Sequence, residues 1–334
     1  MMLMDRRRFA VAGASVAAIA ATGARAQAPS GKLVLYTSQP EKDANQTVAA
    51  YRKANPGVEV EIFRSGTTEI MAKLAAEFSA GQPRPDVLLI ADSVSMESLK
   101  AGDRLESYAG AKTDGFDPQS FDSKDKTYFG TKLITTGIAY NKAAKIVPAS
   151  WTDLMKPELK GQISMPSPLY SGAAAITLGV FSQRPDLGWK FFEALKANET
   201  VAVRGNGAVL RSVATGEKPY GILVDFMAYN AKAQGSPVEF VAPKEGVTAV
   251  TEPVCILKTA SNKPAARAFI DFILSEDGQK LALSQGYLAA RESVGRPAWL
   301  PEGAKLPLMP MDIAAVLKTT DADKKRFADM FGAA

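Results

Sequence analysis

The sequence predicts an α/β fold made of two lobes. Between Lys32 and Ser93, apolar strand-like segments alternate with helix-like segments, the pattern of a parallel sheet covered by helices. The chain has 334 residues and 46% hydrophobic content, and chains of this size usually form two domains. A turn of Ser and Gly before a helix also occurs twice, about one hundred residues apart, which indicates one such turn in each lobe.

The first 26 residues have the pattern of an export signal. Three arginines precede an apolar run that is too short to span a bilayer, and residues 24–26 fit a cleavage site. We therefore expect the mature chain to begin near Gln27. Residues 6–9 resemble a twin-arginine motif, although Asp5 stands where Ser or Thr is preferred; a general-secretion signal is the alternative, and Met4 is an alternative start.

Composition excludes several function classes. Removal of residues 1–26 takes away four arginines and one aspartate, so the net charge falls from +5 to +2 and gives no argument for binding nucleic acid or an anionic membrane. Cys255 is the only cysteine and lies in an apolar run, as a buried structural thiol would. The chain has no histidine, which excludes histidine-dependent triads, histidine acid–base catalysis and histidine metal sites.

Short polar residues follow the three strands expected in the first lobe, at 32–37, 58–63 and 86–91. Ligands of open α/β sheets bind beyond the carboxyl ends of the strands. At the second of these ends a helix is expected to begin, and its unpaired N–H groups and positive dipole end favour an anion. The structural alternative is ordinary helix capping. The candidate ligand-binding residues at these three ends are Thr37, Ser38, Ser65, Gly66, Thr67, Thr68, Asp92 and Ser93.

The second lobe repeats this arrangement. Ser171, Gly172 and Ala173 form a second turn between a short apolar run and a helix-forming run. Asp225 follows a predicted strand, where it caps the next helix or receives an ammonium or hydroxyl group of a ligand, and Tyr229 is a further candidate. Residues 204–207 contain a Gly-x-Gly pair, which we discount as a dinucleotide site because a third glycine and the strand–helix frame are missing.

Two strands are expected to cross between the lobes, at 132–141 and 251–257. The predicted organisation is therefore a signal at 1–26, a first lobe at 27–132 and 250–300, and a second lobe at 133–249 and 301–334. Two closing helices are expected at 264–274 and 275–285. The proline-containing tail is expected to pack across the surface and to end in a short helix.

The ordered set of these segments resembles the periplasmic solute-binding proteins of ATP-driven importers, in particular the ferric-iron and phosphonate branch. The resemblance covers nearly the whole mature chain and rests on segments whose order is more specific than any one of them: 33–38, 64–67, 85–88, 137–141, 148–154, 160–163, 171–174, 208–211 and 221–225. It implies a two-lobe periplasmic binding protein fold of the type II-like class that closes like a clamshell on a solute. It also implies delivery of the solute to an ABC permease with a cytoplasmic ATPase.

The resemblance leaves the solute open. Iron-binding members carry adjacent tyrosines at a position that falls on Phe226 and Met227 here, and a histidine that this chain lacks, although Tyr170, Tyr220 or Tyr229 could substitute. Hydroxyl and backbone donors from both lobes suit a phosphonate or phosphate ester better, with Asp225 or Asp92 pairing with an amino or hydroxyl group of the solute. Thiamine-type and carboxylate ligands are further alternatives.

We therefore predict a periplasmic, monomeric binding protein for a small anion, with no cofactor, no metal, no catalytic residue and no nucleic-acid partner. The alternative of another class is an exported enzyme that uses carboxylate, lysine or tyrosine chemistry.

Overall fold

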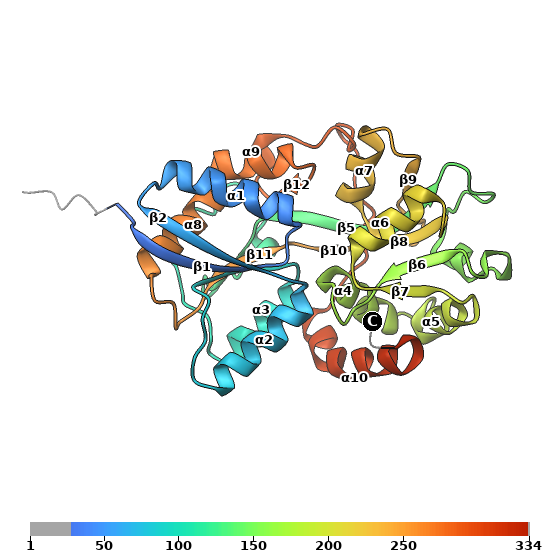
Figure 1. Cartoon of the computed structure of the whole chain (residues 1–334), viewed down its shortest axis with the longest axis horizontal. Helices are drawn as coiled ribbons and strands as arrows, with labels where there is room; N and C mark the ends of the chain where they lie inside the picture. Colours follow the sequence, from blue (N-terminus) through green and yellow to red (C-terminus); the bar gives the residue numbers. More distant parts are fainter. Residues whose placement is uncertain (1–27, 333–334) are drawn as a thin grey trace, which may run out of the picture.

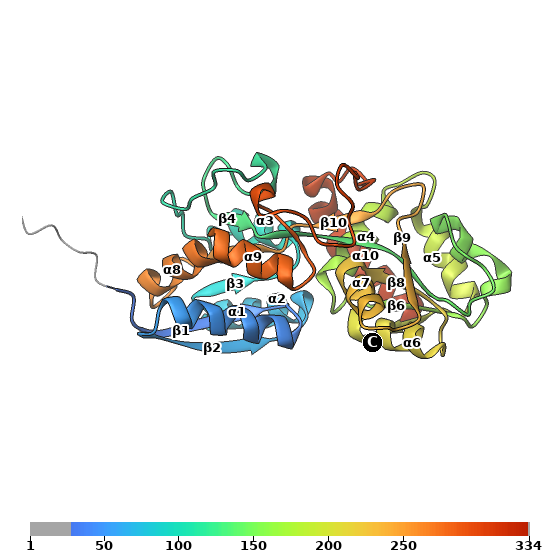
Figure 2. The ribbon, with the colours of Figure 1, turned by 90° about the horizontal axis from the view of Figure 1, so that it is seen from above.

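The computed structural model describes residues 28–332, so the predicted export signal lies outside the described residues. Within that range the chain forms two lobes, each built around its own β-sheet with helices packed against it (Figure 1). Figure 2 shows the same division from above, with α1, α8 and α9 in one lobe and α5, α6 and α7 in the other. The predicted two-lobe α/β class is confirmed.

The first sheet has the strand order β2-β1-β3-β11-β4. Its strands are β1 (Gly31–Thr37), β2 (Val58–Arg64), β3 (Val87–Leu89), β4 (Tyr128–Gly130) and β11 (Pro253–Ile256). The pairs β1–β2 and β1–β3 are parallel, as expected, whereas β11 runs antiparallel to β3 and β4. The sheet is therefore mixed, because β11 enters it from the other lobe.

Helices cover both faces of the first sheet (Figure 1). They are α1 (Glu41–Ala54), α2 (Thr67–Ser79), α3 (Ser93–Ala101), α8 (Lys263–Leu274) and α9 (Glu276–Ser284). Tyr51 and Phe269 belong to the apolar core on the α1 and α8 side, and Ile70 and Met96 to the core on the α2 and α3 side. Cys255 is fully buried in the second of these cores, which confirms a structural thiol, and burial raises the pKa of its thiol to about 12.

The second sheet has the order β10-β5-β8-β6-β7, and β9 and β12 also pair with β5. Its strands are β5 (Lys132–Asn141), β6 (Ile163–Pro166), β7 (Val201–Val203), β8 (Tyr220–Val224), β9 (Val238–Val241), β10 (Thr248–Val250) and β12 (Leu288–Ala289). Its helices are α4 (Gly172–Ser182), α5 (Gly188–Ala197), α6 (Asn206–Thr215), α7 (Asp225–Ala233) and α10 (Ile313–Phe331). Trp151, Phe181 and Phe191 contact one another edge to face in the core of this lobe.

Two of the passages of the chain between the sheets lie next to each other. It leaves β4 at Gly130 and enters β5 at Lys132, and it leaves β10 at Val250 and enters β11 at Pro253. The two connections are tied together, because the Thr131 N–H donates to the carbonyl of Thr251 at 3.0 Å. These short paired segments are the natural pivot for movement of one lobe against the other.

The tail differs from the expected short helix. Helix α10 has 19 residues, begins after the N-cap Asp312 and packs against α4 of the second lobe and α3 of the first. Val316 packs closely on Gly179 of α4: a Cβ added to Gly179 would lie 2.6 Å from the Val316 side chain. Among the described residues, no helix is both long and apolar enough to cross a membrane.

Candidate functional site

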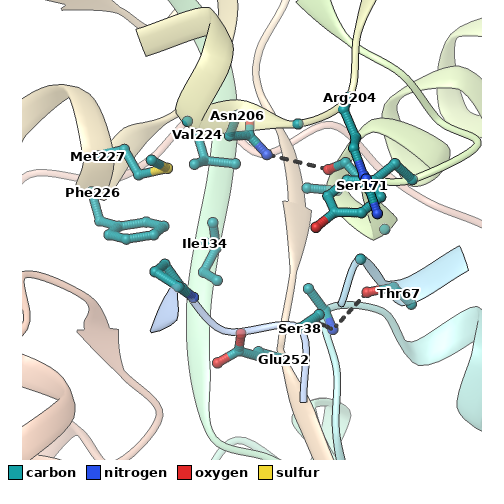
Figure 3. A pocket seen from close by; sticks show the side chains of 18 of the residues that line it. Ser38, Thr67, Ile134, Ser171, Arg204, Asn206, Val224, Phe226, Met227 and Glu252 are labelled. Atoms are coloured by element: carbon teal, nitrogen blue, oxygen red, sulfur yellow. Dashed lines mark hydrogen bonds between the residues drawn. The ribbon is translucent and has the colours of Figure 1, made fainter. Parts of the chain in front are cut away.

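A cavity of about 340 Å³ lies between the lobes, beyond the carboxyl ends of the central strands. Figure 3 shows how its side chains converge from both lobes. Residues of the first lobe and its connections that line it are Ser38, Pro40, Arg64, Gly66, Thr67, Ala91, Glu252 and Tyr287. Residues of the second lobe that line it are Ile134, Tyr170, Ser171, Gly172, Ala173, Arg204, Gly205, Asn206, Gly207, Ala208, Arg211, Val224, Phe226 and Met227.

The first of the two predicted Ser-Gly turns forms one wall of the cavity. Gly66 is the N-cap of α2 and has extended backbone angles, and Thr67 is the first residue of the helix. The Thr67 Oγ1 and Ser38 Oγ atoms both accept a hydrogen bond from the Ala91 N–H, at 3.3 and 3.0 Å. The carboxyl ends of β1, β2 and β3 are thereby tied together beside the cavity.

The second turn forms the opposite wall. Ser171 caps α4 by accepting a hydrogen bond from the Ala174 N–H at 3.3 Å. Asn206 donates from Nδ2 to Ser171 Oγ at 3.2 Å, and its Oδ1 is buried with no hydrogen-bond partner among the described residues. Since Asn206 is also the first residue of α6, a third helix begins at the cavity.

Three guanidinium groups line the cavity. Arg64 donates from Nε to the Gln39 carbonyl and from Nη1 to Tyr170 Oη, both at 2.8 Å. Arg204 lies 2.8 Å from a carboxylate oxygen of Glu69 and places its guanidinium 4.8 Å from the centre of the Tyr170 ring. Arg211 also lines the cavity. A guanidinium keeps its charge at every physiological pH, and of the three only Arg204 has a carboxylate partner among the described residues, so this part of the cavity has a net positive charge.

One carboxylate lines the cavity, and a lysine neutralises it. The side chains of Glu252 and Lys132 are almost completely buried, and their charged atoms lie 2.6 Å apart. Burial raises the pKa of Glu252, against the opposing effect of the Lys132 charge. The Lys132 ammonium also lies 4.1 Å from the centre of the Tyr287 ring. The pair therefore adds little net charge to the cavity.

The lobes contact each other directly beside the cavity. The Thr68 N–H donates to the Tyr170 carbonyl at 3.3 Å, and Thr68 Oγ1 donates to the Pro168 carbonyl at 3.0 Å. A Cβ on Gly66 would lie 2.3 Å from the Tyr170 carbonyl oxygen, and a Cβ on Gly172 would lie 2.7 Å from Thr67 Oγ1. Glycine at both positions is therefore required for this close approach of the lobes.

Six of the thirteen predicted residues line the cavity: Ser38, Gly66, Thr67, Ser171, Gly172 and Ala173. Four others occupy capping or internal positions. Asp92 caps α3 through the Ser95 N–H, and Ser93 is the first residue of that helix. Thr37 accepts from the Gln39 N–H, and Ser65 donates to Glu69. Thr68 bonds to the other lobe, as described above, rather than facing the cavity.

Asp225 does not line the cavity either. Its Oδ2 accepts hydrogen bonds from the N–H and the hydroxyl of Thr135, at 3.0 and 2.7 Å, and its Oδ1 accepts from the Phe226 N–H. Burial raises the pKa of Asp225 to about 6, although these hydrogen bonds oppose the shift. Tyr229 also lies outside the lining, with its ring stacked on Trp299 at a centroid distance of 4.5 Å. The side chains of Asp225 and Tyr229 are thus engaged in contacts within the protein and do not line the cavity.

The prediction missed all three arginines, Asn206 and Glu252. Arg64 directly precedes the first predicted turn, and a positive charge beside a helix start is a usable signal for an anion site. Residues 204–207 carried a second signal, because β7 ends at Val203 and α6 begins at Asn206 with glycine between them. The segment is not a dinucleotide motif, but its strand–glycine–helix pattern places a helix start, which favours an anion, at this position. Among the described residues, no group of three or more acidic or cysteine side chains could hold a metal ion.

Comparisons with known proteins agree with this architecture. A model of the bacterial extracellular solute-binding protein family matches residues 82–315. A putrescine/cadaverine-binding protein of Pseudomonas aeruginosa is 27% identical over 241 residues, which cover 64% of this chain and 67% of that protein.

Solved structures give the same result. The periplasmic binding protein AfuA from Actinobacillus pleuropneumoniae, solved with fructose-6-phosphate bound, matches with a TM-score of 0.82 at 25% identity, over 91% of this chain and 99% of that one. Iron-bound HitA from Pseudomonas aeruginosa has the same fold, with a TM-score of 0.77 at 21% identity over 89% and 99% of the two chains. Proteins of this architecture thus bind solutes of different chemistry, and the residues of the cavity must decide between them.

Proposed function

Because the chain belongs to the family of bacterial extracellular solute-binding proteins, which serve ABC importers, we propose that its cavity captures a small oxyanionic solute, an organophosphonate or a phosphate ester. The solute is bound in the periplasm as the lobes close and is passed to a permease that a cytoplasmic ATPase drives. The observation that carries this proposal is the charge of the cavity. Three guanidinium groups line it, of which Arg204 alone has a carboxylate partner among the described residues, and the one carboxylate of the lining is paired with Lys132.

The geometry of the donors supports an oxyanion. The hydroxyls of Ser38 and Thr67 come from one lobe, and those of Ser171 and the side chain of Asn206 come from the other. Three helices begin at the cavity wall, where unpaired backbone N–H groups and the helix dipole favour negative charge. Arginine binds phosphate with two parallel hydrogen bonds, which adds geometric selectivity. An oxyanion held by both lobes stabilises the closed arrangement.

Iron fits this cavity poorly. Phe226 and Met227 occupy the positions where the iron-binding branch carries its tyrosines, and both line the cavity without offering an oxygen ligand. Tyr170 accepts a hydrogen bond from Arg64, and Tyr287 donates one to Asp43 at 2.6 Å. A hard Fe(III) ion prefers several phenolate and carboxylate oxygens. The available phenols are engaged within the protein.

A polyamine fits poorly for the opposite reason. Its ammonium groups would require carboxylates, and the cavity offers only Glu252, which Lys132 already neutralises. Its three arginines would repel a cation. The cavity also lacks a free general acid or base, because Glu252 is engaged and the chain has no histidine. We therefore propose binding without catalysis.

Isothermal titration with methylphosphonate, inorganic phosphate, putrescine and Fe(III)-citrate tests the proposal. We expect the phosphorus oxyanions to bind in a 1:1 ratio without any product. Thr67→Val and Ser171→Ala should each weaken binding by about 1–3 kcal/mol through a lost hydrogen bond. Ser79→Ala is the matched control, because Ser79 lies at the far end of α2 and bonds only to the Ala75 carbonyl. Saturation by iron with a phenolate-to-metal absorption band would refute the oxyanion proposal.

A further inference from the structure

The cavity is divided into a polar side and an apolar side. Figure 3 shows Ser38, Thr67, Ser171 and Arg204 together on one side. On the other side lie Ile134, Val224, Phe226 and Met227. The volume of about 340 Å³ exceeds what a bare phosphate or methylphosphonate needs, so the apolar side has room for the rest of a solute.

The apolar side is built as a rigid wall. The Phe226 ring is 6% exposed and rests on Tyr287, with a centroid distance of 4.1 Å. Tyr287 is completely buried, and its hydroxyl is fixed by Asp43. Ile134 and Val224 come from the neighbouring strands β5 and β8, which pair next to each other in the sheet. These contacts hold the apolar surface in place whether or not a solute is present.

The apolar side offers few groups to hydroxyls. Glu252 lies at its edge, but its charge is already paired with the Lys132 ammonium through Oε2. Asn206 Oδ1, which has no hydrogen-bond partner among the described residues, lies at the top of the cavity beside the Ser171 hydroxyl (Figure 3). A sugar hydroxyl buried against Phe226 and Met227 would lose its bonds to water without replacement, which is unfavourable.

From this division we infer that the solute carries an apolar body, such as an aromatic ring or a branched hydrocarbon, on its phosphate or phosphonate group. The inference rests on the proposed function, because it assigns the polar side to the oxyanion. It narrows the solute class to apolar monoesters and phosphonates and disfavours sugar phosphates. Contact of an apolar body with Phe226, Met227, Val224 and Ile134 removes apolar surface of both partners from water.

Three ligands distinguish the assignment of the polar side to an oxyanion from the assignment of the apolar side to an apolar body. Phenyl phosphate offers an apolar ring, fructose-6-phosphate offers a hydroxylated body, and inorganic phosphate offers no body. We expect phenyl phosphate to bind the full chain about tenfold more tightly than either of the others in isothermal titration. If the other two bind as tightly, the apolar assignment is overturned while the oxyanion proposal stands. If none of the three binds, the proposed function itself fails.

A variant of Met227 tests the apolar side directly. Met227→Gln keeps the length of the side chain but adds an amide, and Met227 is only partly buried, so the fold should survive. We expect a loss of phenyl phosphate affinity of about three- to tenfold and a smaller loss of inorganic phosphate affinity. Met71→Gln is the matched control, because Met71 is also part-buried, on α2, but does not line the cavity. Equal losses for both ligands would overturn the inference.

Discussion

Lys132 and Glu252 form a buried ion pair at the point where the chain crosses between the lobes. The Nζ and Oε2 atoms are 2.6 Å apart, and the two side chains are 3% and 2% exposed. Lys132 begins β5 after the first crossing, and Glu252 lies between β10 and β11 at the second. The pair thus joins both crossing segments beside the floor of the cavity, where a charge in either partner alone would be strongly disfavoured.

This position makes the pair important for stability. Glu252→Gln should lower the free energy of unfolding by about 3–5 kcal/mol, because it leaves the Lys132 charge buried without a partner. The double variant with Lys132→Met should recover much of that loss. Urea denaturation measures both values. Glu276→Gln, which removes an exposed partner of Lys280, serves as a control and should leave the urea midpoint nearly unchanged. A loss for Glu252→Gln no larger than in this control would contradict the expectation.

The close approach at Gly66 predicts a variant that folds but cannot close. An added Cβ would meet the Tyr170 carbonyl oxygen of the other lobe at 2.3 Å, whereas the extended backbone of Gly66 itself accepts alanine. We expect Gly66→Ala to keep the thermal stability of the ligand-free protein and to lose at least about tenfold in ligand affinity. Small-angle scattering should show that the ligand no longer compacts the variant.

Gly207→Ala is the matched control for this experiment. Gly207 also lines the cavity, but a Cβ there would meet nothing within 4 Å. Its affinity and compaction should match those of the unmodified protein. If Gly66→Ala binds and compacts as well as Gly207→Ala, closure does not depend on the contact with Tyr170.

Variants at the contact between Arg204 and Glu69 distinguish a role in ligand binding from a role in linking the lobes. Glu69→Gln removes the charge of the link between the lobes and leaves an amide oxygen that can still accept from Ser65, and because the Arg204 and Glu69 side chains are largely exposed this should cost little affinity. Arg204→Gln removes the link and also a guanidinium of the cavity, so its loss of affinity for phosphorus oxyanions should be larger. Titration of both variants at low and high salt measures the difference. Equal losses would show that Arg204 acts only as a link.

Asp225 predicts a dependence of stability on pH. Burial raises the pKa of Asp225 to about 6 from 3.8, so between about pH 4 and 6 the native carboxyl keeps a proton that the unfolded chain has lost. The native state then binds more protons than the unfolded state, and the contribution of Asp225 to the free energy of unfolding falls as pH rises through this window. The total fall is at most roughly 3 kcal/mol.

The Asp225→Asn variant provides the measurement. The free energy of unfolding of the unmodified protein, minus that of the variant, should decrease steadily from pH 4 to pH 7. The amide changes the hydrogen bonds with Thr135, so the sign of this difference at one pH is not informative, whereas its slope is. A difference that does not change with pH would show that Asp225 has the same pKa in both states.

The class of fold followed from local patterns. The alternating strand at 58–63 and the apolar spacing after Thr68 are short-range properties of the chain, and the structure has β2 and α2 at these places. The two Ser-Gly turns were identified for the same reason, because a helix start needs a cap whatever surrounds it. Their shared position in one cavity then followed from the rule that ligands bind beyond the carboxyl ends of parallel strands.

The direction and the partners of side chains were decided by the tertiary structure. Asp225 and Arg204 illustrate this: the sequence favoured the first as a ligand contact and passed over the second, yet Thr135 of a neighbouring strand engages Asp225, and the second lobe brings Arg204 to the cavity. The pairing of Lys132 with Glu252, 120 residues apart in the chain, likewise exists only because two crossing segments lie together. Local sequence thus determined which elements form and where they begin, since those depend on neighbouring residues. Only packing decided which polar groups remain free for a solute, since that depends on contacts between segments far apart in the chain.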